Sequence, residues 1–212
     1  MSEKHIFVGL LGLTGSGKST LAGLLKRSGF LHLEEPFVAN PFLSDFYASG
    51  MKEKALQSQL FFLLRKWALT MAAGRLLEYF PVDVDPSMDL DVHMYVEALR
   101  EMGSLSMAEY DLYHLTAEAL MNGLPKIDLL IYCRVRPGTA MVRIKSRGRG
   151  MEKCITEEYL ALQMACLEKW LGQTSVPSLV LDFDALDAKT EEGASGIVEE
   201  VEKALKLIRR SK

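Results

Sequence analysis

Cysteine and histidine are scarce in this sequence, and their spacing excludes the common metal-binding patterns. The 212 residues include three cysteines and four histidines. Cys133, Cys154 and Cys166 lie far apart and form no C-x-x-C pair, and no histidines form an H-x-x-x-H or H-E pairing. Scattered cysteines in odd number are typical of a reduced protein that uses cysteine as a small core residue. We therefore expect a cytoplasmic protein without a cysteine or histidine metal site.

Long apolar runs and a large net charge are also lacking. No apolar run approaches the ~18 residues that a membrane-spanning helix needs, and the sequence shows no signal peptide. The 25 basic and 28 acidic residues give a net charge of −3, so no overall field favours nucleic acid or an anionic membrane. With 49% hydrophobic and 25% charged residues, the composition is that of a globular protein. These features predict one domain over residues 1–212, with neither nucleic acid nor a membrane as partner.

Short apolar runs alternate with longer segments of helical periodicity. In the last such segment Ile197, Val201, Leu205 and Ile208 form an apolar stripe, and residues 189–196 before it are expected to be a loop. Strands that alternate with helices predict an α/β fold with a mostly parallel sheet, whose functional strand ends share one edge. The expected strands cover residues 5–11, 30–33, 79–84, 127–133 and 178–183.

A phosphate-binding motif directly follows the first apolar run. Residues 12–19, GLTGSGKS, fit G-x-x-x-x-G-K-[ST] and precede a helical run. Glycines let backbone N–H groups turn towards a phosphate, while Lys18 can reach the β- and γ-phosphates and Ser19 can hold Mg²⁺. The alternative is a Gly/Ser turn that matches by chance, but the strand and helix on either side favour nucleotide binding. The predicted ATP-binding residues are Gly12, Thr14, Gly15, Ser16, Gly17, Lys18, Ser19 and Thr20.

A basic segment follows the fourth apolar run. Residues 134–151 contain five arginines, one lysine and no acid, although the protein is acidic overall. Arg143 and Arg147 are spaced i, i+4 on one helix face, and Arg149 follows in an R-G-R-G sequence. Three interpretations remain open: a solvated basic face, an RNA-binding patch, or a lid that clamps the phosphates of ATP. We favour the lid because the segment follows a strand of a P-loop protein.

Four aspartates lie close together around a proline in residues 83–91. A calcium loop is excluded, because glycine is absent at the sixth position and Met94 stands where the bidentate glutamate is needed. The segment instead predicts the third strand, which ends at Asp85 facing the P-loop and runs into a helix. Asp85 is expected to be the N-cap of this helix, with Pro86 at its first position.

Taken together, these motifs resemble the deoxynucleoside kinases, which phosphorylate deoxyadenosine, deoxyguanosine or deoxycytidine at the 5′-hydroxyl. The resemblance is carried by GLTGSGKST, LEEPFVANPFLSDFY, LQSQLFFLL, DPSMDLDVHMY, GSLSMAEYDLY, LPKIDLLIYCRV and RIKSRGRGME, and it extends to about Asp184. It implies a P-loop kinase fold with a five-stranded parallel sheet flanked by helices and an Arg-rich lid at about residues 143–153. It also implies ATP and Mg²⁺ as cofactors, a deoxynucleoside substrate and a homodimer.

The resemblance implies a role for each matching residue. Glu35 resembles the general base that accepts the 5′-hydroxyl proton. The Gln59 amide and Asp91 match base-reading positions, which favour bases with an exocyclic amine over thymine. Lys66 stands where the family often has an arginine, next to Arg65. The other matching positions are Tyr47 and Glu152 at the sugar 3′-hydroxyl, Tyr95 against the base, and the lid residues Arg143, Arg147 and Arg149 as catalytic charges beside Lys18.

One departure from the family pattern leaves two functions open. Where the family carries an acid–Arg–Ser triplet, this chain has Asp85-Pro86-Ser87, so the acid that contributes to the Mg²⁺ site is kept and the arginine is lost. With Mg²⁺ on Ser19 and Asp85, the protein is expected to be an active kinase with slow turnover, in which Arg65, Arg143 or Arg147 replaces part of the lost charge. The alternative is a weak or inactive relative that acts as a regulatory or partner-binding subunit. A P-loop kinase of another family is a third and less favoured interpretation.

Overall fold

A five-stranded parallel sheet forms the centre of the molecule. The computed structural model describes residues 5–186, 188 and 190–210. The strand order is β2-β3-β1-β4-β5, and every neighbouring pair is parallel. Each strand begins within two or three residues of the apolar run that predicts it, so the expected fold class is confirmed. The strands are β1 (Phe7–Leu11), β2 (Leu31–Glu34), β3 (Val82–Asp85), β4 (Leu129–Arg134) and β5 (Ser178–Asp182).

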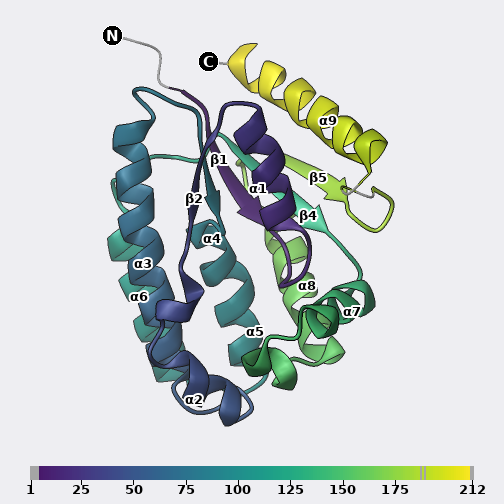
Figure 1. Ribbon diagram of the computed structural model, residues 1–212. Helices are drawn as coiled ribbons and strands as arrows, with labels where there is room; N and C mark the ends of the chain where they lie inside the picture. Colours follow the sequence, from purple (N-terminus) through teal and green to yellow (C-terminus); the bar gives the residue numbers. More distant parts are fainter. Residues whose placement is uncertain (1–4, 187, 189, 211–212) are drawn as a thin grey trace.

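Helices connect the strands and cover both faces of the sheet. In Figure 1, α1 and α9 lie together over the near face, whereas α5 and α8 lie behind the sheet. Short helical turns, η1 (Phe37–Ala39), η2 (Asp91–Tyr95) and η3 (Gly150–Cys154), lie between the longer helices. The α-helices are α1 (Lys18–Arg27), α2 (Leu43–Ala48), α3 (Ala55–Leu76), α4 (Met88–Leu90), α5 (Val96–Glu101), α6 (Met107–Met121), α7 (Pro137–Arg147), α8 (Glu157–Leu171) and α9 (Glu191–Arg210).

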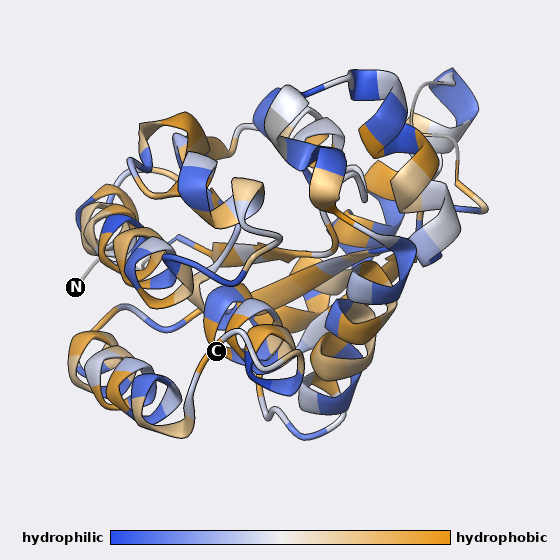
Figure 2. Cartoon of the chain, turned by 90° about the horizontal axis from the view of Figure 1, so that it is seen from below, coloured by the Kyte–Doolittle hydropathy of each residue, from blue (hydrophilic) through white to orange (hydrophobic). Residues whose placement is uncertain are grey.

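The hydrophobic core lies between the central strands and the helices. All five residues of β1 and the first five of β4 are buried, as expected for strands covered on both faces. Figure 2 shows the strands in the hydrophobic colour, with hydrophilic residues on the outer sides of the helices. Within the described residues, no helix combines the length and apolar character needed to cross a bilayer.

The carboxyl ends of the five strands meet at one edge of the sheet, because all of them are parallel. This edge faces the lower end of the molecule in Figure 1, where α2 and α7 lie. The chain leaves β1 through the glycine-rich loop, and β3 and β4 pair with β1 on its two sides. The sequence order thus reverses next to β1, which is where ligands bind in open α/β sheets.

The structure corrects two sequence-based expectations about local conformation. The last helix begins at Glu191 rather than after Gly196, and Lys189 lies outside the described residues. The Thr190 hydroxyl accepts a hydrogen bond from the Gly193 backbone N–H at 3.1 Å, and two glutamates occupy the first turn. This capping and the favourable charge at the helix N-terminus compensate for the two glycines.

The second correction concerns the start of α4. Its N-cap is Ser87 rather than Asp85, and the Asp85–Pro86 peptide bond is cis. Asp85 is still part of β3, where it pairs with Glu34 and its carbonyl accepts a hydrogen bond from the Glu35 N–H at 3.2 Å. Its backbone is therefore committed to the sheet, and the helix can start only after the proline.

Candidate active site

A cavity of about 730 Å³ opens at the carboxyl edge of the sheet. Its walls come from the glycine-rich loop, the ends of β2 and β3, helices α2 and α3, the lid around α7 and η3, and the loop after β5. The volume is within the range of pockets that bind small molecules and cofactors. Segments that are far apart in sequence thus form one continuous site.

The glycine-rich loop wraps around the amino end of α1. The Lys18 ammonium donates hydrogen bonds to the carbonyls of Gly12 at 2.9 Å and Leu13 at 3.0 Å. Burial lowers the pKa of Lys18, and the nearby Asp85 carboxylate opposes that shift. Of the predicted ATP-binding residues, 14–20 line the cavity, whereas Gly12 is buried beneath them. The loop therefore presents a cation and the start of a helix to the cavity, as anion binding requires.

Gly17 has a conformation that only glycine adopts easily. Its φ angle is 108°, outside the regions open to other residues. A Cβ atom at this position would lie 2.7 Å from Cδ1 of the Phe183 ring. The loop after β5 therefore packs directly against the phosphate-binding loop.

Glu35, Lys66 and Asp91 form a buried group of charges in the cavity wall. The Lys66 Nζ lies 3.3 Å from Glu35 Oε2 and also donates a hydrogen bond to Asp91 Oδ1. The exposed fractions of the three residues are 8%, 2% and 1%, respectively. Burial raises the pKa of Glu35 to about 7, although Lys66 opposes that shift. Burial alone would lower the pKa of Lys66, but the two carboxylates outweigh it and raise this pKa, so Lys66 remains a cation.

Three buried side-chain oxygens in the same wall have no hydrogen-bond partner among the described residues. They are Glu35 Oε1, Gln59 Oε1 and Asp91 Oδ2. Their parent residues all line the cavity, together with Tyr47, Tyr95 and Glu152. Buried acceptors without partners are costly, so a site that contains several of them is suited to a ligand that brings hydrogen-bond donors.

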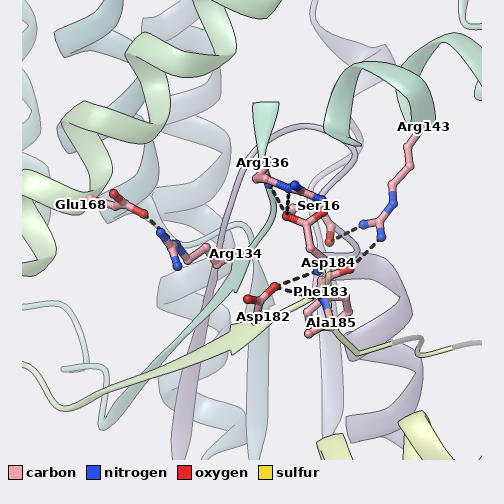
Figure 3. A network of polar contacts seen from close by, with 9 residues as sticks. All are labelled: Ser16, Arg134, Arg136, Arg143, Glu168, Asp182, Phe183, Asp184 and Ala185. Carbon is pink, nitrogen blue, oxygen red and sulfur yellow. Dashed lines mark hydrogen bonds and ion pairs between the residues drawn. The ribbon is translucent and has the colours of Figure 1, made fainter. Parts of the chain in front are cut away.

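The three lid arginines line the cavity but contact protein groups. Arg143 donates hydrogen bonds to the carbonyls of Gly15 at 3.4 Å, Ser16 at 3.2 Å and Phe183 at 2.8 Å. Figure 3 shows its guanidinium reaching from α7 to the backbone of Ser16 and Phe183. Arg143 therefore joins the lid to the P-loop and to the loop after β5.

The other two lid arginines converge on Glu152. Arg147 donates to both carboxylate oxygens of Glu152, at 2.7 and 2.8 Å, and Arg149 lies 3.6 Å from Oε1. The Arg149 guanidinium also lies 4.4 Å from the centre of the Phe37 ring. The two arginines that are expected to clamp phosphate are thus paired with Glu152, which is expected to bind the sugar.

The loop after β5 forms a wall of the cavity that the sequence did not identify. Residues 183–186 and Ala188 line the cavity. The Asp184 carboxylate accepts hydrogen bonds from the backbone N–H of Arg136 at 2.7 Å and from its Nε at 3.2 Å (Figure 3). Asp182 in turn accepts bonds from the N–H groups of Asp184 and Ala185, at 2.9 and 3.2 Å. The basic segment 134–151 therefore also anchors this loop, and Arg134 pairs with Glu168 of α8 at 3.0 Å.

Comparisons with known proteins agree with this geometry. A sequence model of the family described as deoxynucleoside kinase matches residues 9–206. The chain belongs to the deoxynucleoside kinase family. It is 31% identical over 155 residues to the deoxyguanosine kinase of Bacillus subtilis (strain 168), covering 73% of this chain and 72% of that protein. It is 28% identical over 216 residues to the deoxyadenosine kinase of Lactobacillus acidophilus (strain ATCC 700396 / NCK56 / N2 / NCFM), covering 94% and 96%.

A solved structure shows the same fold. The deoxyadenosine kinase from M. mycoides, solved with the products dCMP and a flexible dCDP bound, superposes with a TM-score of 0.80 at 25% identity. The match covers 93% of this chain and 100% of that chain. The resemblance, the fold class and the kinase activity expected from the sequence are confirmed. This deoxynucleoside kinase is a phosphotransferase with a nucleotide as donor and a deoxynucleoside as acceptor.

In this deoxynucleoside kinase, Lys66 has a larger part in the cavity wall than the sequence indicates, and Arg65 has a smaller one. Arg65 is exposed and does not line the cavity, whereas Lys66 is buried and contacts Glu35. A signal was present in the helical periodicity, because Gln59, Leu63 and Lys66 lie on the same buried face of α3. The structure therefore brings Lys66, rather than Arg65, into contact with Glu35 in the cavity wall.

The residues proposed for Mg²⁺ fit a hard cation in this deoxynucleoside kinase. Asp85 is buried at the end of β3, and its Oδ1 has no hydrogen-bond partner within the described part of the chain. Ser19 lines the same cavity. No group of three or more His, Cys, Asp or Glu side chains among the described residues could hold a metal. An oxygen pair of this kind suits Mg²⁺, which usually binds one or two protein oxygens together with water and substrate phosphates.

Proposed function

We propose that this kinase transfers the γ-phosphoryl group of ATP to the 5′-hydroxyl of a deoxynucleoside whose base carries an exocyclic amine. The observation that carries the proposal is the continuity of one cavity from the P-loop to the unpartnered oxygens of Glu35, Gln59 and Asp91. A triphosphate on the loop and a nucleoside on these oxygens would share this cavity. Enclosing both reactants in one site is the main requirement of phosphoryl transfer.

Glu35 acts in this proposal as the general base. Its free Oε1 accepts the proton of the 5′-hydroxyl, whose oxygen then attacks the γ-phosphorus while the bond to the β–γ bridging oxygen breaks and ADP leaves. A base with a pKa of about 7 is matched to neutral pH, where it is partly ionised and still able to hold a proton. Lys18 stabilises the negative charge of the transferring phosphoryl group, and so does the lid once its arginines turn from protein groups to phosphate. Bound Mg²⁺ on Ser19 and Asp85 would neutralise charge on the phosphates.

The base is proposed to bind between Gln59 and Asp91. Both residues present an acceptor oxygen without a partner, which suits the amine of adenine, guanine or cytosine. Thymine carries a carbonyl oxygen instead of that amine, so its oxygen would face another acceptor. Tyr95 lines the cavity beside Asp91 and is proposed to pack on the base. Tyr47 and Glu152 are proposed to bind the 3′-hydroxyl of the sugar, because both line the cavity and their elements α2 and η3 pack against each other.

A second candidate function is a weak or inactive nucleotide-binding relative. It is favoured by Pro86, which lines the cavity and offers neither a charge nor an N–H. The two functions predict the same binding and differ in turnover, which is about 1–100 s⁻¹ for typical kinases.

The proposal extends to assembly and location. Helices α3 and α6 pack against each other and expose the large apolar side chains Leu64, Met71, Leu112 and Leu115. An exposed apolar surface of this kind supports a homodimer in which a second copy covers it. Cys133 and Cys166 are buried free thiols, which supports a cytoplasmic location.

A coupled ADP-release assay with purified protein, ATP, Mg²⁺ and each of the four natural deoxynucleosides tests the proposal. We expect turnover with at least one amino-bearing nucleoside and the poorest kcat/KM with thymidine, since a site built for a hydrogen bond rejects an analogue that lacks it. Lys18→Ala should abolish transfer while circular dichroism remains unchanged. Binding of ATP and nucleoside without turnover would favour the inactive relative, and absence of ATP binding by calorimetry would overturn both functions.

A further inference from the structure

The ammonium group of Lys66 joins two carboxylates that come from different elements of the cavity wall. Glu35 follows β2 and is the proposed general base, whereas Asp91 opens η2 and is proposed to bind the base of the nucleoside. One oxygen of each carboxylate contacts Lys66, namely Glu35 Oε2 at 3.3 Å and Asp91 Oδ1. The other oxygen of each is the buried one that has no partner in the described part of the molecule. Lys66 thus determines which oxygen of each acid remains free.

The ammonium group is engaged mainly by the protein. A lysine has three N–H donors, and two of them are directed at Asp91 and Glu35. The Phe62 ring, 5.6 Å from Nζ, occupies a further side. Two of its three donors are thus directed at the two acids, and through these acids Lys66 can act on the substrate.

The other cations that line the cavity have different partners. Lys18 contacts the carbonyls of Gly12 and Leu13, Arg143 contacts three backbone carbonyls, and Arg147 and Arg149 contact Glu152. Among the described residues, Lys66 is the cavity cation that forms an ion pair with Glu35.

We propose that Lys66 is a positioning residue that orients the Glu35 carboxylate towards the 5′-hydroxyl and, through Asp91, couples this orientation to the base-binding end of the cavity. The inference rests on the proposed function of Glu35 and Asp91. Without the ammonium, two like charges would lie close together in a buried wall, and each carboxylate would be free to rotate away from the substrate. A displacement of about 1 Å in a reacting group can reduce the rate on the order of 10²-fold.

Steady-state kinetics with the best nucleoside of the wild-type panel tests this role. Lys66→Met keeps the length of the side chain without its charge and should lower kcat on the order of 10²-fold. The KM for ATP should change by less than about threefold, because Lys66 does not contact the P-loop. Lys66→Arg keeps the charge and should recover part of the loss. The matched control is Arg75→Met, which removes a cation from an exposed position on the same helix and should change kcat less than about threefold.

A double-mutant cycle separates positioning from stability. Lys66→Met leaves two buried carboxylates without a cation. The double variant Lys66→Met, Asp91→Asn removes one of those charges, so the double variant should have a higher thermal melting temperature than Lys66→Met alone. If orientation is transmitted through Lys66, Asp91→Asn should lower kcat in the wild-type background and have little further effect when Lys66 is absent.

Three outcomes would overturn the proposal. The first is a kcat for Lys66→Met within about threefold of wild type, and the second is an equal loss in Arg75→Met. The third is independent, additive effects of Asp91→Asn and Lys66→Met on kcat. Failure of the proposed function is distinguishable, because it would appear as lack of turnover in the wild-type protein before any variant is compared.

Discussion

Replacing Gly17 by alanine should destabilise the protein and weaken binding of ATP. Gly17 directly precedes α1 with φ at 108° and ψ at 11°, and the new Cβ would lie 2.7 and 2.9 Å from Cδ1 and Cε1 of Phe183. Contacts this short are essentially never observed for Cβ atoms, so either the ring or the loop must shift. Phe183 is 3% exposed, which leaves the ring little room.

The cost has two parts of similar size. A residue other than glycine in a sparsely populated backbone region costs about 1–3 kcal/mol. Forcing extra volume into a closely packed contact costs about 1–3 kcal/mol more. We therefore expect Gly17→Ala to lower the free energy of unfolding by about 2–6 kcal/mol, the sum of the two ranges. Arg143 donates hydrogen bonds to the carbonyls of both Ser16 in the P-loop and Phe183. A shift of either group would disturb the phosphate-binding loop and the lid, so the affinity for ATP should fall as well.

Urea unfolding followed by circular dichroism measures the stability change, and calorimetry measures ATP binding. Gly23→Ala is the matched control, because Gly23 lies within α1 and a Cβ there meets no atom within 4 Å. This control should stabilise the protein by about 0.5–1 kcal/mol, the difference in helix propensity between the two residues. Gly17→Ala combined with Phe183→Leu should recover the part of the loss that comes from the ring but not the backbone part. An unchanged free energy of unfolding for Gly17→Ala would refute the assigned conformation of the loop.

Two further predictions concern acids and their partners. Glu35→Gln should lower kcat on the order of 10²–10⁴-fold, as expected for loss of a general base, while calorimetry should still detect the nucleoside; a loss smaller than about tenfold would exclude Glu35 as the base. His32→Gln should lower the free energy of unfolding by roughly 1–3 kcal/mol at pH 6, because the His32 Nδ1 lies 2.6 Å from Oδ2 of the buried Asp83. The hydrogen bond with Asp83 raises the pKa of His32, so this stabilisation is complete below the unfolded-state pKa of about 6.5 and is lost as the pH rises through the folded-state pKa. Urea unfolding should therefore show a smaller cost of His32→Gln at pH 9 than at pH 6, and an equal cost would contradict the pairing.

The fold was predictable because its signals are local. The apolar runs that become β1 and β4 are buried on both faces, and the glycine-rich motif fixes the loop between β1 and α1. Most of the cavity residues were predictable because they lie in short motifs next to strand ends. Their assigned roles remain predictions, since position in the cavity does not establish the chemistry.

The rest depended on contacts between distant segments. Lys66 has no motif of its own, and its importance arises from the approach of α3 to Glu35 and Asp91. The loop after β5 joins the cavity through contacts with distant segments. Asp184 accepts a hydrogen bond from Arg136, and the Phe183 ring packs against Gly17 of the P-loop. Asp85 was wrongly expected to cap a helix because its participation in β3 can be recognised only after strand pairing is known.

The parallel arrangement of the strands also separates the ends of the fold from its chemistry. The start of β1 and the last turn of α9 lie at the upper end of the molecule in Figure 1, opposite the edge that forms the cavity. If the enzyme is attached to a sensor surface or a fusion partner through the start of β1 or the last turn of α9, the cavity should remain open to solution. The same geometry makes the two ends suitable for joining by a linker, so that a new start of the chain could be placed in an exposed loop away from the site.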